Sequence, residues 1–541
     1  MKQVATTLVL LAGFAYRAEC RNDSSMVHDF DSIKPSAELT WTPCFDDFTC
    51  SRLQVPLDYS NQSLGTASIA FMKWAGKNAT ADSQSFVIIP GKDPLQTHLD
   101  FTYKTKADAT APGGPGGSSI DLLQAYKDKL GSMFGDTYNF VAFDPRGVGR
   151  SGPRLDCFRN NTQARTAFNR AHYTGATNTS AASLEEQYYS AAIYGEWCDE
   201  AVRTDSPYGY YVTTQAVARD LLRFVEAEAE LAGRSDSPPS QAKLWGFGQS
   251  YGTVIGTTFA SMFPDRVGRL VLESVMDVDQ YYANDWRSNF VNSDEAFAQL
   301  PLLCHAAGPD RCSFWGPTPE NITARMDGVI EKIKGHPIPV SGVDGRSLPG
   351  LATYSDLKYF IADGIYEPLT SFPIMADVFA QLEKGNASAL VDRVERMYLG
   401  ADDDGGVIIR CADSSRANKL TTMGEWKHYI QDAVSSSKYI GDIFPIWART
   451  ILCRSIHSQL PDSMMIQGPV TGIGKPVSFP ILFTGNTIDP VAPAANLLTP
   501  RPSARKMSSR FPGSVVLLQE AVGKCELLAN PSIVSLGCST P

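Results

Sequence analysis

The chain has 541 residues, of which 43% are hydrophobic and 20% charged, the proportions of an ordinary globular protein large enough to shield a reactive site. Its net charge of −10 repels polyanions, which argues against nucleic acid as a partner. The acidic residues are dispersed except for one short run, Asp402–Asp404. Because Gly405 and Gly406 follow that run, we interpret it as a solvated loop and not as a calcium site.

The first residues have the pattern of an export signal. Lys2 supplies one positive charge, an apolar stretch runs from Val4 to Tyr16, and Ala15 and Ala18 are small. This pattern predicts a signal peptide, which we place at residues 1–18. The stretch is shorter than the ~20 apolar residues of a membrane helix, and no later segment reaches that length. We therefore expect a secreted, extracellular protein without a membrane span.

Cysteines and glycosylation motifs agree with export. Among the 11 cysteines, Cys44 and Cys50 are close in sequence, as are Cys304 and Cys312. In an oxidising compartment such neighbours usually form disulfides, although the full pairing cannot be read from sequence. The Asn-x-Ser/Thr motifs predict glycosylation at Asn22, Asn61, Asn78, Asn160, Asn178, Asn321 and Asn386.

Along the chain, short apolar runs alternate with helical patterns, which predicts an α/β fold with a mostly parallel sheet. A helix is expected from Thr214 to Gly233. From 277 to 475 the alternation stops, and helical patterns with proline-rich breaks predict a mainly helical cap inserted between sheet strands. The core is thus expected at 38–276 and 476–541. The expected strands are 86–90, 140–143, 243–247, 269–273, 480–484 and 514–519.

The pentapeptide Gly248–Gly252 has the form G-x-S-x-G and lies between an expected strand and an expected helix. That context is required of a nucleophile elbow, in which the serine projects from a sharp turn at a helix N-terminus. The helix dipole there favours developing negative charge. We therefore predict Ser250 as a nucleophile. The alternative interpretation is a purely structural turn.

Two further features could complete a serine hydrolase site. The glycine-rich loop Gly113–Gly117 could present a backbone N–H to an oxyanion, and we propose Gly114 and Tyr251 as the two donors. Asp489 follows the expected strand 480–484, where a carboxylate can orient a catalytic base. The alternatives are a flexible glycine linker and a turn-forming aspartate before Pro490.

Several motifs between about residues 38 and 523 resemble those of the tripeptidyl-aminopeptidase-like α/β-hydrolases, the prolyl and tripeptidyl aminopeptidase family. The resemblance implies an α/β-hydrolase fold and a secreted serine exopeptidase acting on peptide N-termini. Ser250 would be the nucleophile, Asp489 the triad acid, and the cap would restrict access to chain ends. Glu273 or Asp277 could bind the amino group of the substrate. The motifs are Trp41–Cys44, Cys50, Val55–Tyr59, Gly113–Gly117, Asp144–Gly152, Trp245–Thr253, Phe263–Asp277, Thr484–Pro493 and Met507–Leu517.

The chain departs from that family at the base. In the family a Gly-His pair follows the last expected strand, whereas this chain has Gly523-Lys524, and none of its 7 histidines follows Asp489. The triad histidine is therefore absent, and its position is taken by Lys524. Loss of a triad member typically costs ~10⁴–10⁶-fold in rate. The alternatives are Lys524 as the base, or His457 recruited from the cap.

A second departure is the polar segment Lys92–Gly113, which separates strand 86–90 from the glycine loop and has no counterpart in the family. Both departures begin with Gly-Lys, which GGTAAA or GGTAAG can encode, and these codons contain the start of an intron. We therefore hypothesise that residues 92–113 and 524–541 are translated introns.

The remaining alternatives are an esterase on the same fold and a secreted binding protein that kept the pocket but lost the base. No Cys/His cluster has zinc-ligand spacing, and no phosphate loop or dinucleotide fingerprint occurs, so we expect neither metal nor cofactor. Peptides are the expected substrates. The sequence leaves the exact substrate and the oligomeric state open.

Overall fold

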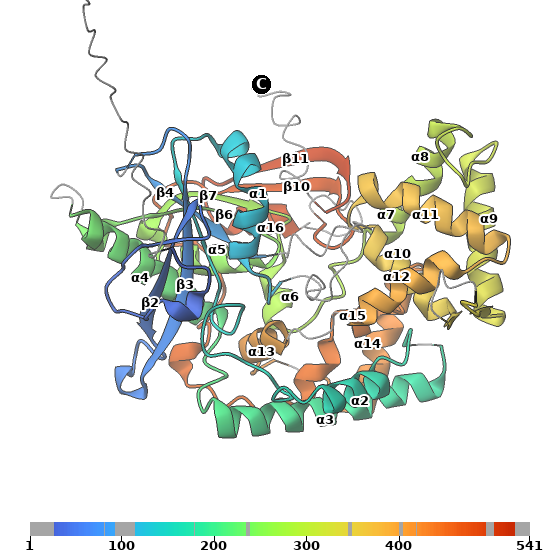
Figure 1. Ribbon diagram of the computed structural model, residues 1–541, viewed down its shortest axis with the longest axis horizontal. Coiled ribbons are helices and arrows are strands. Elements are labelled where there is room, and N and C mark those ends of the chain that lie inside the picture. The colour runs from blue at the N-terminus through green and yellow to red at the C-terminus, as the bar shows by residue number, and fades with distance from the viewer. Residues whose placement is uncertain are drawn as a thin grey trace, which may run out of the picture.

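The computed structural model describes residues 26–80, 82–91, 114–177, 179–233, 238–343, 349–399, 404–417, 419–493 and 503–524 (Figure 1). Several predictions therefore fall outside the described residues: the signal peptide at 1–18, the glycosylation sites Asn22 and Asn178, and Gly113 of the glycine loop.

The core is a nine-stranded sheet in the order β1-β2-β3-β5-β4-β6-β7-β10-β11. From β5 to β11 all neighbours pair in parallel, whereas β1, β2 and β3 extend the sheet in antiparallel fashion. Every expected strand is present, so the prediction of a mostly parallel α/β fold is confirmed. The strands are β1 (Thr42–Cys44), β2 (Phe48–Pro56), β3 (Thr66–Ala75), β4 (Ser85–Ile89), β5 (Asn139–Phe143), β6 (Leu244–Gln249), β7 (Val267–Glu273), β10 (Leu482–Ile488) and β11 (Val515–Val522).

Helices cover both faces of this sheet. Along β5, Phe140 and Ala142 join a buried cluster with α1 (Ser119–Phe134), while Val141 and Phe143 join the cluster that contains α4 (Thr214–Ala232). Such alternation places successive side chains on opposite faces, and burial of both explains the continuous apolar runs. Helix α5 (Tyr251–Met262) follows β6, and α16 (Ser503–Arg510) precedes β11.

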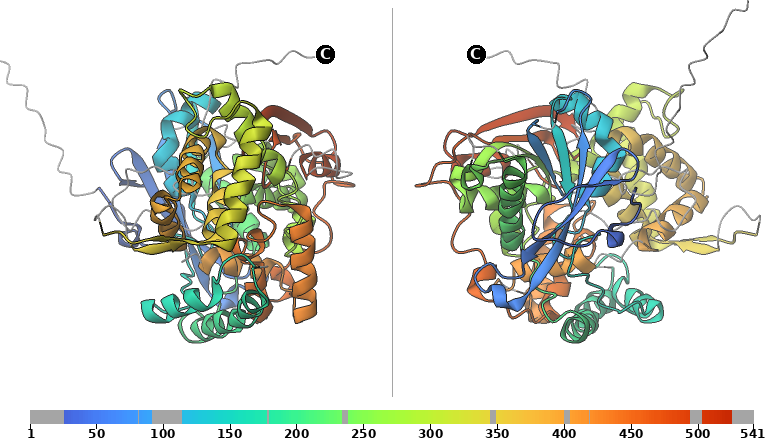
Figure 2. Two further views of the ribbon diagram at one scale, coloured as in Figure 1. Left: turned by 90° about the vertical axis from the view of Figure 1, so that its right-hand side faces the viewer. Right: turned by 60° about the vertical axis from the view of Figure 1, so that its left-hand side comes forward.

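A mainly helical cap lies between β7 and β10 in sequence and forms the side of the molecule opposite the N-terminal strands (Figures 1 and 2). Two short strands, β8 (Ile338–Val340) and β9 (Gly350–Ala352), pair within it. Its helices are α6 (Val278–Tyr282), α7 (Ser293–Phe297), α8 (Gln299–Ala307), α9 (Pro319–Gly335), α10 (Tyr354–Gly364), α11 (Pro368–Glu383), α12 (Ser388–Leu399), α13 (Asp404–Asp413), α14 (Met423–Ser436) and α15 (Phe444–Trp447).

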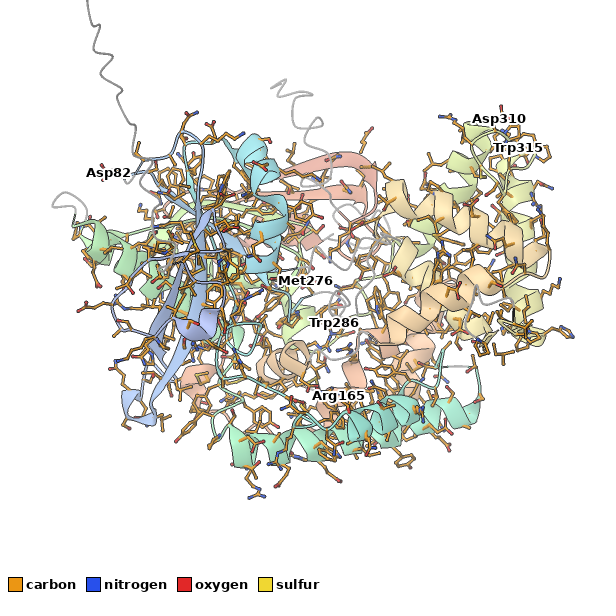
Figure 3. All side chains as sticks on the ribbon, in the orientation of Figure 1. Asp82, Arg165, Met276, Trp286, Asp310 and Trp315 are labelled. Atoms are coloured by element: carbon orange, nitrogen blue, oxygen red, sulfur yellow. A yellow bond between two sulfur atoms is a disulfide. The ribbon has the colours of Figure 1, made fainter. Side chains whose placement is uncertain are left out.

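Two helices that precede β6 in sequence also pack against elements of the cap. They are α2 (Thr162–His172) and α3 (Ala181–Asp205), which lie along the lower edge in Figure 1. Arg165 of α2, labelled in Figure 3, donates to Asp404 of α13 at 2.7 Å. The prediction that Asp404 lies in a solvated loop is therefore wrong. Asp404 is only 3% exposed, and its carboxylate also accepts hydrogen bonds from Cys157 N and Tyr194 Oη. Asp402 and Asp403 lie outside the described residues.

Four disulfides join described residues. Cys44–Cys50 and Cys304–Cys312 confirm the pairs expected from sequence proximity. Cys157–Cys198 links the segment before α2 to α3, and Cys411–Cys453 links α13 to a later turn of the cap. Within the described ranges, no helix is long and apolar enough to cross a membrane. In every glycosylation motif that the structure describes, the asparagine is exposed. These residues are Asn61, Asn78, Asn160, Asn321 and Asn386.

Candidate active site

Ser250 lies at a sharp turn between β6 and α5. Its backbone has φ 56° and ψ −119°, a left-handed conformation that costs a non-glycine residue free energy and is typical of functional turns. The N–H of Ser250 donates to the carbonyl of Glu273 on neighbouring β7 at 2.9 Å, and the carbonyl of Ser250 accepts from Thr253 N. The strained turn is thus fixed from both sides.

The two glycines of the pentapeptide permit this turn by close packing. An added Cβ at Gly248 would lie 2.7 Å from the carbonyl oxygen of Gly252. An added Cβ at Gly252 would lie 2.6 Å from the carbonyl oxygen of Ile89, at the end of β4. A side chain at Gly248 would therefore push α5 away from β6, and a side chain at Gly252 would push it away from β4.

The structure brings the two expected oxyanion donors together. An added Cβ at Gly114 would lie 2.9 Å from Cβ of Tyr251, so the glycine loop packs directly beside the residue that follows Ser250. The same hypothetical atom would lie 1.9 Å from the carbonyl oxygen of Gly91. Gly91 and Gly114, which flank segment 92–113, are therefore in contact with each other at the elbow.

Asp489 is fully buried just beyond the end of β10. Its Oδ1 accepts from the backbone N–H groups of Val491 and Ala492 at 2.9 and 2.8 Å, and its Oδ2 accepts from Ser274 Oγ at 2.9 Å. Three donors hold the carboxylate in one orientation. The turn-forming alternative is compatible with the Oδ1 contacts, but it leaves the bond from Ser274 unexplained.

Lys524 occupies the position next to Ser250. Its Nζ donates to Ser250 Oγ at 2.7 Å, and the residue is only 5% exposed. The backbone before it is fixed by β10, because Gly523 N donates to Ile488 O and Asn486 Nδ2 donates to Gly523 O. An amine at this distance can hydrogen-bond the serine, but it can accept the serine proton only as the neutral amine.

The cap contributes Tyr366 to the site, a residue that no sequence motif indicated. Its carbonyl accepts from Lys524 N at 2.9 Å, and Lys524 Nζ lies 5.3 Å from the centre of its ring. Burial, and after it the charge of Asp489, raises the pKa of Tyr366 well above its ordinary value. The neutral phenol therefore lies beside both the lysine and the acid, and it connects the cap to the core at the reacting serine.

The two acids suggested for the substrate amino group have different surroundings. Glu273 is fully buried at the end of β7 and accepts from Gln249 Nε2 at 2.8 Å. Asp277 instead binds Lys506 Nζ through both carboxylate oxygens, at 2.8 and 2.7 Å. The Lys506 ammonium already neutralises Asp277, whereas Glu273 lies next to the elbow.

His457 is not brought to Ser250. Its ring is bonded through Nδ1 to Asp199 of α3 at 2.7 Å, and its side chain is 77% exposed, whereas Ser250 is buried. Among the residues that the structure describes, no three histidine, cysteine or acidic side chains gather as a metal site would need.

Comparisons with known proteins agree with this architecture. The family model of the alpha/beta hydrolase fold matches residues 111–310. A tripeptidyl aminopeptidase of Streptomyces lividans is 27% identical over 520 residues, covering 92% of this chain and 83% of that protein. Serine protease Hip1 of Mycobacterium tuberculosis is 27% identical over 249 residues, covering 44% of this chain and 40% of that protein.

Among solved structures, a serine hydrolase of Cycloclasticus zankles matches with a TM-score of 0.32 and 9% identity, covering 88% of this chain and 93% of that one. The family match and the sheet order together give the chain the α/β-hydrolase fold. Its sequence resembles the tripeptidyl aminopeptidases over most of its length, and a serine hydrolase is the function class that these relatives support.

Proposed function

We propose that the protein is a secreted serine peptidase that releases short peptides from substrate N-termini through an acyl-enzyme on Ser250. The observation that carries this proposal is the strained turn at Ser250, with φ 56° and with Gly114 packed against the following Tyr251. Two of the named relatives are peptidases, and one of them is a tripeptidyl aminopeptidase. Cap residues at the serine, such as Tyr366, are consistent with a site that admits chain ends.

In this mechanism Ser250 Oγ attacks the scissile carbonyl, and the resulting oxyanion accepts hydrogen bonds from the N–H groups of Gly114 and Tyr251. Donors fixed in place before the reaction stabilise that charge without reorganisation, and one such donor is typically worth ~10²–10³-fold in kcat. Asp489 would orient the base, and the buried carboxylate of Glu273 would attract the amino group of the substrate. Asp277 is less suited to that role because Lys506 neutralises it.

The catalytic base is the part of the site in which this sequence differs from the family it resembles. A lysine Nζ at 2.7 Å from Ser250 Oγ occupies the place where a triad base must lie. An ordinary lysine has a pKa of ~10.4 and is protonated at neutral pH, when it cannot accept the serine proton. The chain as printed is therefore proposed to be a weak catalyst, and a form with histidine at position 524 a competent one.

A substrate panel tests the peptidase proposal against an esterase. Tripeptidyl-aminomethylcoumarins, single-residue aminoacyl-aminomethylcoumarins and a p-nitrophenyl ester are offered to the Lys524→His variant, with the Ser250→Ala/Lys524→His double variant as the blank. We expect Ser250-dependent release from the free N-terminal tripeptides, lost when their amino group is acetylated. Ester cleavage without peptide cleavage would favour the esterase and overturn the peptidase.

The bond between Lys524 and Ser250 favours a second candidate function. An ammonium that donates to Oγ withholds the serine from attack, so the same pocket could bind peptide N-termini without turnover. Calorimetry with an unlabelled tripeptide distinguishes the two. Tight binding by the Lys524 protein, together with no turnover even after Lys524→His, would identify a binding protein.

Secretion is proposed on the signal pattern and agrees with the four disulfides, which persist in oxidising compartments. Recovery of the protein from culture medium with an N-terminus near residue 19 is the expected result. The exposed asparagines of the described glycosylation motifs would then carry glycans that endoglycosidase removes.

A further inference from the structure

Asp413, the last residue of α13, is a buried acid outside the predicted triad. It is 5% exposed, and its carboxylate accepts three hydrogen bonds. Oδ1 accepts from Thr214 N at 2.7 Å, while Oδ2 accepts from Thr214 Oγ1 at 2.6 Å and from Tyr281 Oη at 2.7 Å. Thr214 begins α4, so a carboxylate of the cap binds the N-terminus of a core helix, where negative charge is favourable.

The same contacts continue to the elbow. Thr214 Oγ1 lies 2.7 Å from Tyr251 Oη. Because the one hydroxyl proton of Thr214 goes to Asp413, Tyr251 must be the donor to Thr214. The side chain of Tyr251, whose backbone N–H is the proposed oxyanion donor, is thereby tied through Thr214 to Asp413.

The surroundings of this tether are aromatic. The ring of Tyr251 lies 5.6 Å from that of Tyr281, which packs 6.1 Å from Trp286. Figure 3 labels Trp286, and α13 lies in the middle of the molecule in Figure 1. One turn before Asp413, the guanidinium of Arg410 lies 5.3 Å from the centre of the Trp286 ring.

We propose that Asp413 is a positioning residue that holds the oxyanion donor Tyr251 from the cap, and that only the ionised carboxylate does so. The inference rests on the proposed serine-hydrolase function of the same site. A carboxylate has acceptor capacity for all three donors, whereas a protonated carboxyl must itself donate at one oxygen. When the new proton is donated to Thr214 Oγ1, Thr214 turns its own hydroxyl proton toward Tyr251, and the Tyr251 hydroxyl loses Thr214 as its acceptor.

Burial places the protonation of Asp413 within the working range of pH, and the ionisable groups that face it carry no charge there. They are Tyr251 from α5 and Tyr281 and Tyr282 from α6, and burial raises the pKa of each well above its ordinary value, so all three stay neutral. Burial raises the pKa of Asp413 to about 7, against the lowering effect of its hydrogen bonds from Thr214 and Tyr281. The competent state should thus form as pH rises through about 7.

Stability should change in the opposite direction. Because the folded pKa lies above that of an unfolded aspartate, the folded chain holds the extra proton, and this group's contribution to stability is complete only at acid pH. That contribution is lost as pH rises through about 7. A side chain with only a structural role would not make the rate rise while the unfolding temperature falls.

The test compares Asp413→Asn, which imitates the protonated acid, and Tyr251→Phe, which removes only the hydroxyl, with the parent. Tyr188→Phe is the matched control, because its hydroxyl donates to Thr421 O and is not part of the tether. All proteins, the parent included, carry Lys524→His, and kcat is measured from pH 5.5 to 8.5. Each variant's kcat is divided by that of the parent at the same pH, and this ratio cancels the titration of the shared base. We expect kcat ratios near one at pH 5.5 and about one-tenth at pH 8.5 for both tether variants, with KM within twofold.

A ratio independent of pH, or Tyr251→Phe behaving like the control Tyr188→Phe, would overturn the tether. If no variant with an intact Ser250 shows turnover, the proposed function fails, and hydrogen exchange decides the tether alone. The peptide containing Tyr251 should then take up more deuterium in Asp413→Asn than in the parent at pH 8.5, and equally at pH 5.5. Equal uptake at both values would sink the inference.

Discussion

At the scale of single residues, the site depends on position 524. The backbone of Gly523 and Lys524 is fixed by Ile488, Asn486 and Tyr366, so whatever side chain stands at 524 is directed at Ser250. Gly523 itself has φ 106°, and an added Cβ there would lie 2.5 Å from Pro368 of the cap. The scaffold for a base is therefore present even though the residue it holds is a lysine.

Lys524→His is accordingly expected to raise kcat on tripeptide substrates at pH 7.5 by at least ~10³-fold, since removing a triad member costs ~10⁴–10⁶-fold and a new histidine recovers part of this. Initial-rate kinetics measure the gain, and kcat should fall below pH ~6.5 as the imidazole is protonated. Lys524→Gln, which shortens and neutralises the side chain, is the control and should not gain activity. A gain equal to that of Lys524→His would show that only removal of the charge mattered.

At the scale of elements, a buried ion pair between Arg165 of α2 and Asp404 of α13 helps to hold α2 and α3 to the cap. Arg165 and Asp404 are 13% and 3% exposed, and the carboxylate also accepts from Cys157 N and Tyr194 Oη. Breaking a buried pair leaves an uncompensated charge, so Arg165→Met should lower the free energy of unfolding by about 3 kcal/mol. Urea denaturation monitored by fluorescence measures the loss.

The matched control for that prediction is Arg159→Met, in the turn that precedes α2. Arg159 pairs with Asp205, but the two side chains are 43% and 49% exposed, and solvent-exposed pairs contribute about 1 kcal/mol or less. Equal losses in the free energy of unfolding for the two substitutions would show that burial does not increase the contribution of the Arg165–Asp404 pair.

The elements also show which parts of the fold a single sequence reveals. Strands such as β4 and β5 are buried on both faces and therefore appear as continuous apolar runs. The antiparallel strand β2 mixes buried and half-buried residues, gives no such run and was not expected. The elbow was predictable because its glycines and Ser250 are contiguous. Tyr366 and Asp413 were not, since packing of the cap alone brings them to the site.

At the scale of the whole molecule, core and cap meet around one serine. Ser250, Asp489 and Gly114 come from the ends of core strands and the loops that follow them, whereas Tyr366 comes from the cap. The contact between Gly91 and Gly114 means that the chain could pass from β4 into the glycine loop with little rearrangement. The fold thus accommodates a protein without residues 92–113, which agrees with the hypothesis of a translated intron.

Tryptic peptide mass spectrometry of protein recovered from the native source tests that hypothesis at both positions. Because the two glycines already touch, we expect a peptide that joins the sequence before Gly91 to the glycine loop near Gly114. Because Lys524 occupies the place of a triad base, we also expect a peptide in which histidine follows Gly523. Peptides from within 92–113, or a peptide ending Gly523-Lys524, would contradict the hypothesis. In that case the hydrogen bond between Lys524 and Ser250 belongs to the mature protein, and the binding function becomes the stronger candidate.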